Sequence, residues 1–198
     1  MGKLIYHEEV HEYYQDHRRL ISNTEILEAA GFSDYSGVPN HLVDVAAAVG
    51  KAVHKATYLL DKGKSWNRFK TFAGYVEAWK KFKSDYQFKP HIRERPMVDP
   101  LIGVATCPDA WGESKHGQIT VQIKTCPIKD YVGLQLAFEE RVIRSDSGLL
   151  SSPNRFAVEL KSDGTYKPRQ FDDPNDIKVW MAAYTVQSWL WRHNGRSK

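Results

Sequence analysis

Several features of membrane, secreted and nucleotide-hydrolysing proteins are missing from this sequence. Its 198 residues include only two cysteines, Cys107 and Cys126, and no CxxC pair, so neither a disulfide framework nor a cysteine zinc site is predicted. No apolar run approaches the roughly 18 residues of a membrane span. The first residues, MGKLIYHEEV, lack the apolar core of a signal peptide. We therefore expect no membrane association and a cytoplasmic location. The lack of a glycine-rich phosphate loop argues against an ATPase.

The net charge and the composition exclude few classes of function. The 28 Lys and Arg against 24 Asp and Glu leave a net charge of +4, which permits an anionic partner without requiring one. Hydrophobic residues make up 41% and charged residues 26%, as in ordinary globular proteins. The length suits one domain with a single core, which we place at residues 1–198.

The apolar periodicity changes from helical to alternating about halfway along the chain. Helices are predicted at about 24–30, 41–61, 66–84 and 129–144 and from about 174 onward, and strands at 91–98, 101–106, 118–125, 155–160 and 165–171. Leu42, Val45, Val49, Val53 and Leu60 are expected to form the buried stripe of the second helix. Residues 1–20 are compatible with an extended arm, a strand or a short helix. This order predicts a mixed α/β domain with a central mixed sheet flanked by helices.

Aromatic and basic residues interleave in KSWNRFKTFAGYVEAWKKFK (64–83). The pattern is typical of a helix whose aromatics enter the core while its lysines face solvent, which is the interpretation we favour. A surface that stacks the bases of single-stranded nucleic acid is the alternative.

The strand at 118–125 (QITVQIKT) alternates strictly. Its Ile and Val residues are expected to face the core, so Gln122 and Lys124 share the opposite face, about 7 Å apart along the strand. An oxygen donor beside a lysine can bind a cation and orient or deprotonate water. A solvated outer face of an edge strand would have the same pattern.

Asp109 makes the catalytic interpretation stronger. It follows an apolar strand and precedes Gln122 by thirteen residues. Two consecutive strands joined by a short turn bring such positions together. An Asp there, opposite Gln122 and Lys124, can supply oxygen ligands for Mg²⁺ or Mn²⁺.

Four motifs together resemble the PD-(D/E)XK nuclease superfamily, in its RecB-like and phage-type exonuclease branch. ATCPDAWG (105–112) followed by ITVQIKT (119–125) is similar to the paired Asp and Lys motifs, VGKAVH (49–54) to the GxxxH helix motif, RERP (93–96) to the strand that carries a glutamate, and DYVGLQLAFEE (130–140) to the helix that carries a glutamine. The motifs occur in the family's order. The resemblance implies a restriction-endonuclease-like core, with a central mixed sheet flanked by helices.

The resemblance also implies roles for individual residues. Asp109 would be the central metal ligand, with His54 and the main-chain carbonyl of Ile123 as further ligands of Mg²⁺ or Mn²⁺. Lys124 would hold or activate the attacking water and stabilise charge on the scissile phosphate. Gln135 would contact DNA or the lysine.

Glu94 would ligate through water or hold a basic residue such as Arg93 or Arg95. These two arginines, with Tyr131, are also the candidate DNA contacts.

Gln122 departs from the family pattern, because it stands where the second acidic residue is expected. With Asp109 and Lys124 it completes the catalytic set, and its amide oxygen can still donate to a cation but brings no charge. Glu139 stands where an aromatic residue is expected and is a candidate to supply that charge.

The predicted function is metal-dependent hydrolysis of phosphodiester bonds in DNA, with exonuclease action favoured, in phage-type recombination, repair or DNA processing. DNA is the expected partner, along with recombination or replication proteins, and the location would be the host cytoplasm if a phage encodes the protein. The alternative is a catalytically impaired relative that acts as a DNA-binding or interaction protein.

Overall fold

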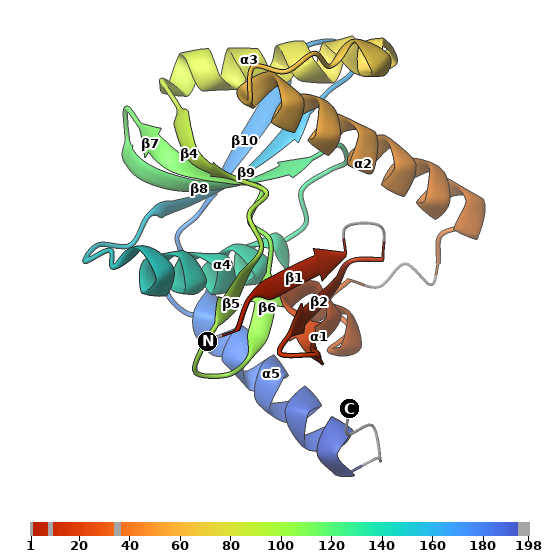
Figure 1. Ribbon diagram of the computed structural model, residues 1–198. Helices are drawn as coiled ribbons and strands as arrows, with labels where there is room; N and C mark the ends of the chain where they lie inside the picture. Colours follow the sequence, from red (N-terminus) through yellow and green to blue (C-terminus); the bar gives the residue numbers. More distant parts are fainter. Residues whose placement is uncertain (1, 8–9, 34–36, 194–198) are drawn as a thin grey trace.

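The structure, a computed structural model, describes residues 2–7, 10–33 and 37–193 (Figure 1). Its elements in chain order are β1 (Leu4–His7), β2 (Glu12–Gln15), β3 (Arg18–Ser22), α1 (Asn23–Ala29), α2 (Asn40–Asp61), the 3₁₀ segment η1 (Asn67–Phe72), α3 (Ala73–Tyr86), β4 (Lys89–Arg93), β5 (Met97–Asp99), β6 (Val104–Thr106), β7 (Ala110–Ser114), β8 (Gly117–Lys124), α4 (Val132–Ser147), β9 (Asn154–Leu160), β10 (Tyr166–Phe171) and α5 (Asp176–His193). The predicted mixed α+β class is confirmed.

The strands of the described residues form two mixed sheets of five strands each. In the first the order is β1-β2-β3-β6-β5, and only β3 and β6 pair in parallel. In the second the order is β10-β9-β8-β7-β4, and only β8 and β9 pair in parallel. The predicted hairpin of β9 and β10 is confirmed, with Tyr166 opposite Leu160.

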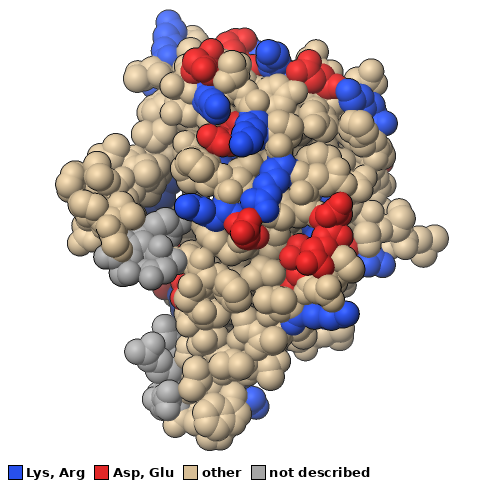
Figure 2. Space-filling view, turned by 180° about the vertical axis from the view of Figure 1, so that it is seen from behind, with Lys and Arg blue, Asp and Glu red and all other residues tan. Residues whose placement is uncertain are grey.

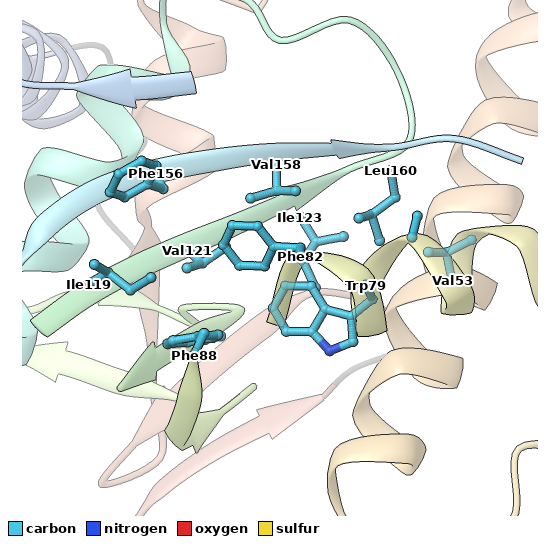
Figure 3. Packing of buried hydrophobic residues seen from close by; sticks show 12 residues of the cluster. Val53, Trp79, Phe82, Phe88, Ile119, Val121, Ile123, Phe156, Val158 and Leu160 are labelled. Carbon is cyan, nitrogen blue, oxygen red and sulfur yellow. The ribbon is translucent and has the colours of Figure 1, made fainter. Parts of the chain in front are cut away.

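The second sheet packs one face against α2 and α3 (Figure 3). The alternation in β8 behaves as predicted, because Ile119, Val121 and Ile123 are fully buried on this face. They meet Trp79 and Phe82 of α3, whose rings stack at a centroid distance of 5.4 Å. The interpretation of these two aromatics as core residues is therefore confirmed.

Helix α4 covers the opposite face of the second sheet and has α1 and α5 on its outer side (Figure 1). Phe138 of α4 stacks on Trp180 of α5 at a centroid distance of 4.0 Å. Because α4 lies over β8, Gln122 is only 2% exposed. The alternative of a solvated outer face on β8 is therefore wrong.

The structure has a mixed sheet flanked by helices, as expected, and a second mixed sheet beside it. Within residues 1–20, whose structure the sequence left open, β1 and β2 are strands, and β3 continues to Ser22 and joins β6 as its parallel partner. The predicted strand at 91–98 is divided between β4 in one sheet and β5 in the other. Helix α1 begins after Ser22, whose side chain and Glu25 form a capping box.

The expected burial of α2 is correct for only part of the helix. Its predicted buried stripe holds at Val53, which is fully buried, but Leu42 and Val45 are 51% and 60% exposed. The N-terminal half of α2 extends beyond the sheet, so nothing described covers these side chains (Figure 1). None of the helices in the described ranges is long and apolar enough to cross a membrane.

Candidate active site

Two crossovers between the sheets carry the acidic residues of the candidate site. Residues 107–109 lead from β6 in the first sheet to β7 in the second, and residues 94–96 lead from β4 back to β5. The crossovers lie side by side, because the N–H of Glu94 donates to the main-chain oxygen of Asp109 at 3.2 Å. Glu94 has a positive φ of 44°, a region that a non-glycine residue rarely adopts. Asp109 and Glu94 therefore lie at the junction of the two sheets.

Asp109 is buried, and its carboxylate contacts Ile123 of β8 and His54 of α2. One carboxylate oxygen, Oδ2, accepts a hydrogen bond from the N–H of Ile123 at 2.7 Å. The other, Oδ1, lies 3.3 Å from Nδ1 of His54. Burial by itself would raise the pKa of Asp109, but the charges of His54 and Lys124 and the Ile123 N–H lower that pKa below its ordinary value. Asp109 is therefore ionised.

His54 joins the oxygen atoms of this site from α2. Its Nε2 lies 3.1 Å from the main-chain oxygen of Ile123, and its Nδ1 lies 3.7 Å from Oε1 of Glu94 as well as close to Asp109. Burial would lower the pKa of His54, but the two carboxylates outweigh burial and raise the pKa to about 10. Both ring nitrogens then carry protons, and the imidazolium occupies a place where oxygen atoms of three residues face a positive charge.

A second group of polar side chains surrounds Glu139 on the α4 side of β8. Nε2 of Gln122 donates to both carboxylate oxygens of Glu139 at 2.9 Å, and Nε2 of Gln135 donates to Oε1 at 3.2 Å. The hydroxyl of Thr106 lies 3.5 Å from the same oxygen. Burial, followed by the charge of Asp109, raises the pKa of the fully buried Glu139 to about 8, although the amide hydrogen bonds and Lys124 oppose this shift. A carboxyl group therefore lies directly against the residue that replaces the expected acid.

Lys124 lies at the end of β8, half-buried between these groups. Its Nζ is 3.4 Å from Oε1 of Gln122 and 3.4 Å from Oε1 of Gln135. Of the two contacts expected for Gln135, the structure contains the one with the lysine. Strand alternation places Lys124 on the same face as Gln122, and helix α4 supplies Gln135 and Glu139 one turn apart.

Arg93 does not have the exposure that a DNA contact needs. It is 5% exposed and forms an ion pair with the buried Asp61 at 2.9 Å, while its other nitrogens donate to the Asp109 main chain and to Thr57. The expected role in DNA binding is therefore corrected to a structural one: Arg93 ties α2 to the crossover that carries Asp109. It is also not held by Glu94.

The other two candidate DNA contacts differ from each other. Arg95 is exposed and forms an ion pair with Asp146 of α4, not with Glu94. Tyr131 is partly buried and packs against two of the apolar clusters at the start of α4. Arg95 therefore remains accessible to a ligand, whereas only part of the Tyr131 ring does.

Tyr13 and Thr106 also lie near the site, and the sequence alone did not indicate them. Tyr13 is buried in β2, and burial together with Cys107, Tyr6 and Glu139 raises its pKa. The pairing of β3 with β6 brings these residues together over more than 80 positions of sequence. No local pattern predicts such a long-range pairing, so no signal within residues 1–20 could have found Tyr13.

The donor atoms around Asp109 are of the kinds that Mg²⁺ and Mn²⁺ prefer, namely carboxylate and carbonyl oxygens with one imidazole. Oε1 of Glu94 is buried without a hydrogen-bond partner and faces the charged ring of His54 at 3.7 Å, as a carboxylate oxygen faces a cation. As they lie, no three His, Cys, Asp or Glu side chains of the described ranges could hold a metal ion together. The ring of His54 itself stands between the oxygens, with Nδ1 toward the carboxylates and Nε2 toward the carbonyl of Ile123.

Comparisons with known proteins show similarity only to solved structures. The chain matches no protein-family model and no curated protein. Among solved structures, it is similar to a crystal structure named as a putative exonuclease from Eubacterium rectale, with 14% sequence identity and a TM-score of 0.44. The match covers 77% of this chain and 69% of the other chain. A similarity this low carries no argument about the chemistry of the site, so that argument depends on the residues themselves.

Proposed function

We propose that the protein is a deoxyribonuclease that depends on Mg²⁺ or Mn²⁺ and cleaves phosphodiester bonds in an active site centred on Asp109. One observation carries the proposal: the carboxylates of Asp109 and Glu94 and the carbonyl of Ile123 converge on a single cationic group, the ring of His54. An oxygen-lined position beside an available lysine suits a divalent cation and the phosphate of a nucleic acid. The PD-(D/E)XK resemblance of the motifs, in the RecB-like branch, supports the same assignment.

Asp109, Glu94 and the Ile123 carbonyl would hold the metal ion, and His54 would join them after it releases a proton. When bound, the ion supplies Lewis acidity toward the phosphate and a lowered pKa for water. Asp109 contributes a negative charge that its hydrogen bond from Ile123 keeps in place. The low pKa of Asp109 means that this charge does not require an alkaline solution.

Lys124 would stabilise the negative charge that develops on the scissile phosphate. Its contacts with Gln122 and Gln135 limit the positions that the ammonium group can take, which favours a fixed geometry. In this proposal Gln122 is a positioning residue, because its amide binds Glu139 and Lys124 at once. Glu139 would provide the carboxylate that the sequence lacks at position 122.

One observation favours the alternative of an impaired DNA-binding relative. With a pKa of about 8, Glu139 is largely protonated at neutral pH in the metal-free protein, so the second negative charge is not in place. A bound cation would lower this pKa by favouring the ionised form. The two functions therefore differ in whether DNA is consumed once Mn²⁺ or Mg²⁺ is added.

The test is degradation of end-labelled linear DNA in Mn²⁺, in Mg²⁺ and in EDTA. We expect cleavage with either metal and none in EDTA, and we expect Asp109→Asn and Lys124→Met to slow it at least about 100-fold, as loss of a charge-stabilising group does. Lys115→Met, on the exposed turn between β7 and β8, is the matched control and should keep the wild-type rate.

Two results would overturn the proposal. If wild-type protein binds DNA but leaves it intact in every metal, the impaired relative is correct. If Asp109→Asn or Lys124→Met cleaves at the wild-type rate, the reaction occurs elsewhere. Exonuclease action, which we favour, further requires that covalently closed circular DNA survives while linear DNA of the same sequence is degraded.

A further inference from the structure

The C-terminal half of α2 and the following η1 form a surface of one charge sign. We define the α2–η1 surface by Lys55, Tyr58, Lys62, Trp66, Arg68 and Phe69. Residues 50–72 contain six Lys and Arg and one acidic residue, Asp61. The Asp61 carboxylate is 2% exposed and is neutralised by Arg93 and Lys83. Every solvent-exposed formal charge of Lys, Arg, Asp and Glu side chains on this stretch is therefore positive.

Each aromatic ring of the α2–η1 surface has a cation over it, and for Trp66 this cation is Lys80 of α3, 5.8 Å from the ring centre. Lys55 and Lys62 lie 5.6 Å and 5.7 Å from the ring centre of Tyr58, as residues one turn before and after it on a helix can. Arg68 lies 4.8 Å from the ring of Phe69. The three rings are only half-buried, so each also presents area to solvent.

The surface is continuous with the candidate active site. Tyr58 follows His54 by four residues and so lies one turn further along the same face of α2. Lys62 follows by one more turn, and Gly63, with a φ of 64°, ends the helix there. The N–H of Lys64 then bonds back to the oxygen of Leu59 at 2.8 Å, which turns the chain into η1 beside the helix end.

This separation of charge is not general over the molecule. The face opposite to the one in Figure 1 shows Lys and Arg side chains interspersed with Asp and Glu (Figure 2). The net charge of +4 is small, so a stretch without exposed acids represents a local concentration of positive charge. Such a concentration attracts a polyanion in particular.

We propose that the α2–η1 surface binds single-stranded DNA and leads it toward Asp109. Lys55, Lys62 and Arg68 would contact phosphates, and the adjacent rings would stack on bases. Cations beside accessible rings suit a single strand, because only unpaired bases offer their faces for stacking. Binding itself is independent of catalysis, whereas delivery to Asp109 rests on the proposed nuclease function.

The first experiment measures the affinity of the full chain for fluorescein-labelled oligo(dT) in EDTA, by anisotropy over a range of salt concentrations. The combined variant Lys55→Gln, Lys62→Gln and Arg68→Gln should reduce the slope of log Kd against log salt by about 2, the value for three lost phosphate contacts on a single strand. The matched control removes three exposed cations on β10 and α5, through Lys167→Gln, Lys178→Gln and Arg192→Gln. It should leave the slope unchanged.

The second experiment tests the rings. Trp66→Leu with Phe69→Leu should weaken oligo(dT) binding about fivefold or more without changing the salt slope, as loss of base stacking does. Trp66→Phe with Phe69→Tyr retains the rings and should keep wild-type affinity, which separates stacking from a loss of folding. The affinity for a blunt duplex of the same length should not change in either variant.

The proposal is wrong if the two charge variants weaken binding equally, or if duplex and single strand bind alike and the ring variants have no effect. These measurements contain no metal, so they do not depend on cleavage. A wild-type protein that binds oligo(dT) as expected but never degrades DNA would remove the nuclease function and leave this surface assigned.

Discussion

Replacing Gln122 by glutamate should destabilise the metal-free protein, and the loss should grow as the pH rises. Gln122 is 2% exposed, and its amide donates two hydrogen bonds of 2.9 Å to Glu139. The substitution is nearly isosteric, but it removes both donors and places a second carboxyl group against the first. It therefore probes the one contact through which a neutral residue replaces the expected acid.

The size of the effect follows from the protonation of the new pair. At pH 6 the two carboxyl groups can share one proton and hydrogen-bond to each other, which limits the cost to about 1–2 kcal/mol. At pH 9 both tend to ionise, and two charges about 3 Å apart repel by roughly 5 kcal/mol at the dielectric response of a protein site. For a chain of this length, the melting temperature should fall by about 10 °C at pH 9 and only by a few degrees at pH 6.

Thermal unfolding of wild-type and variant protein in EDTA at both pH values is the assay. Gln118→Glu is the matched control, because Gln118 lies on the same strand and donates to Glu113 at 3.1 Å, but Gln118 is only partly buried and Glu113 is exposed, so the new repulsion is weak. A Gln122→Glu variant whose melting temperature follows that of the wild type at pH 9 would refute the contact between position 122 and Glu139. If the site also binds Mn²⁺, the metal should raise the melting temperature of the variant more than that of the wild type.

Three further outcomes are expected. The folded pKa of Glu139 is about 8 against an ordinary 4.5, so the folded state keeps a proton that the unfolded state releases, and metal-free stability should fall between these pH values by roughly 5 kcal/mol at most. In urea titrations across pH, Glu139→Gln should abolish this fall in stability. It should retain the fall that His54 causes between its ordinary pKa of 6.5 and its folded pKa of about 10. An unchanged pH profile of stability would contradict the burial of Glu139. Arg93→Met should cost about 3–5 kcal/mol in the same titrations, because it removes a buried partner of Asp61, and a loss below 1 kcal/mol would mean that Lys83 alone suffices. Gly112→Ala should cost about 1–3 kcal/mol in thermal unfolding, because its Cβ would lie 2.1 Å from a carbonyl oxygen of β4, and a stable variant would show that the strands can separate there.

The sequence by itself determined the local direction of the site residues. Strict alternation over 118–125 placed Gln122 and Lys124 on the face opposite Ile123, and the structure has them there. The short connection from Asp109 to this strand predicted their proximity, and Asp109 does accept the N–H of Ile123. These features could be predicted because each depends on the repeat of one strand or on neighbours close in sequence.

Only the tertiary structure decided which faces are covered. The outer face of β8 could have been solvated, but α4 packs over it and brings Glu139 to Gln122, seventeen residues apart. The stripe of α2 could have been buried, but Leu42 and Val45 extend past the sheet. Arg93 was expected to contact DNA, but it is buried in an ion pair with Asp61. Periodicity sets where a side chain points relative to its own element, whereas burial, pKa and partners depend on what distant segments pack against it, and no local pattern contains that information.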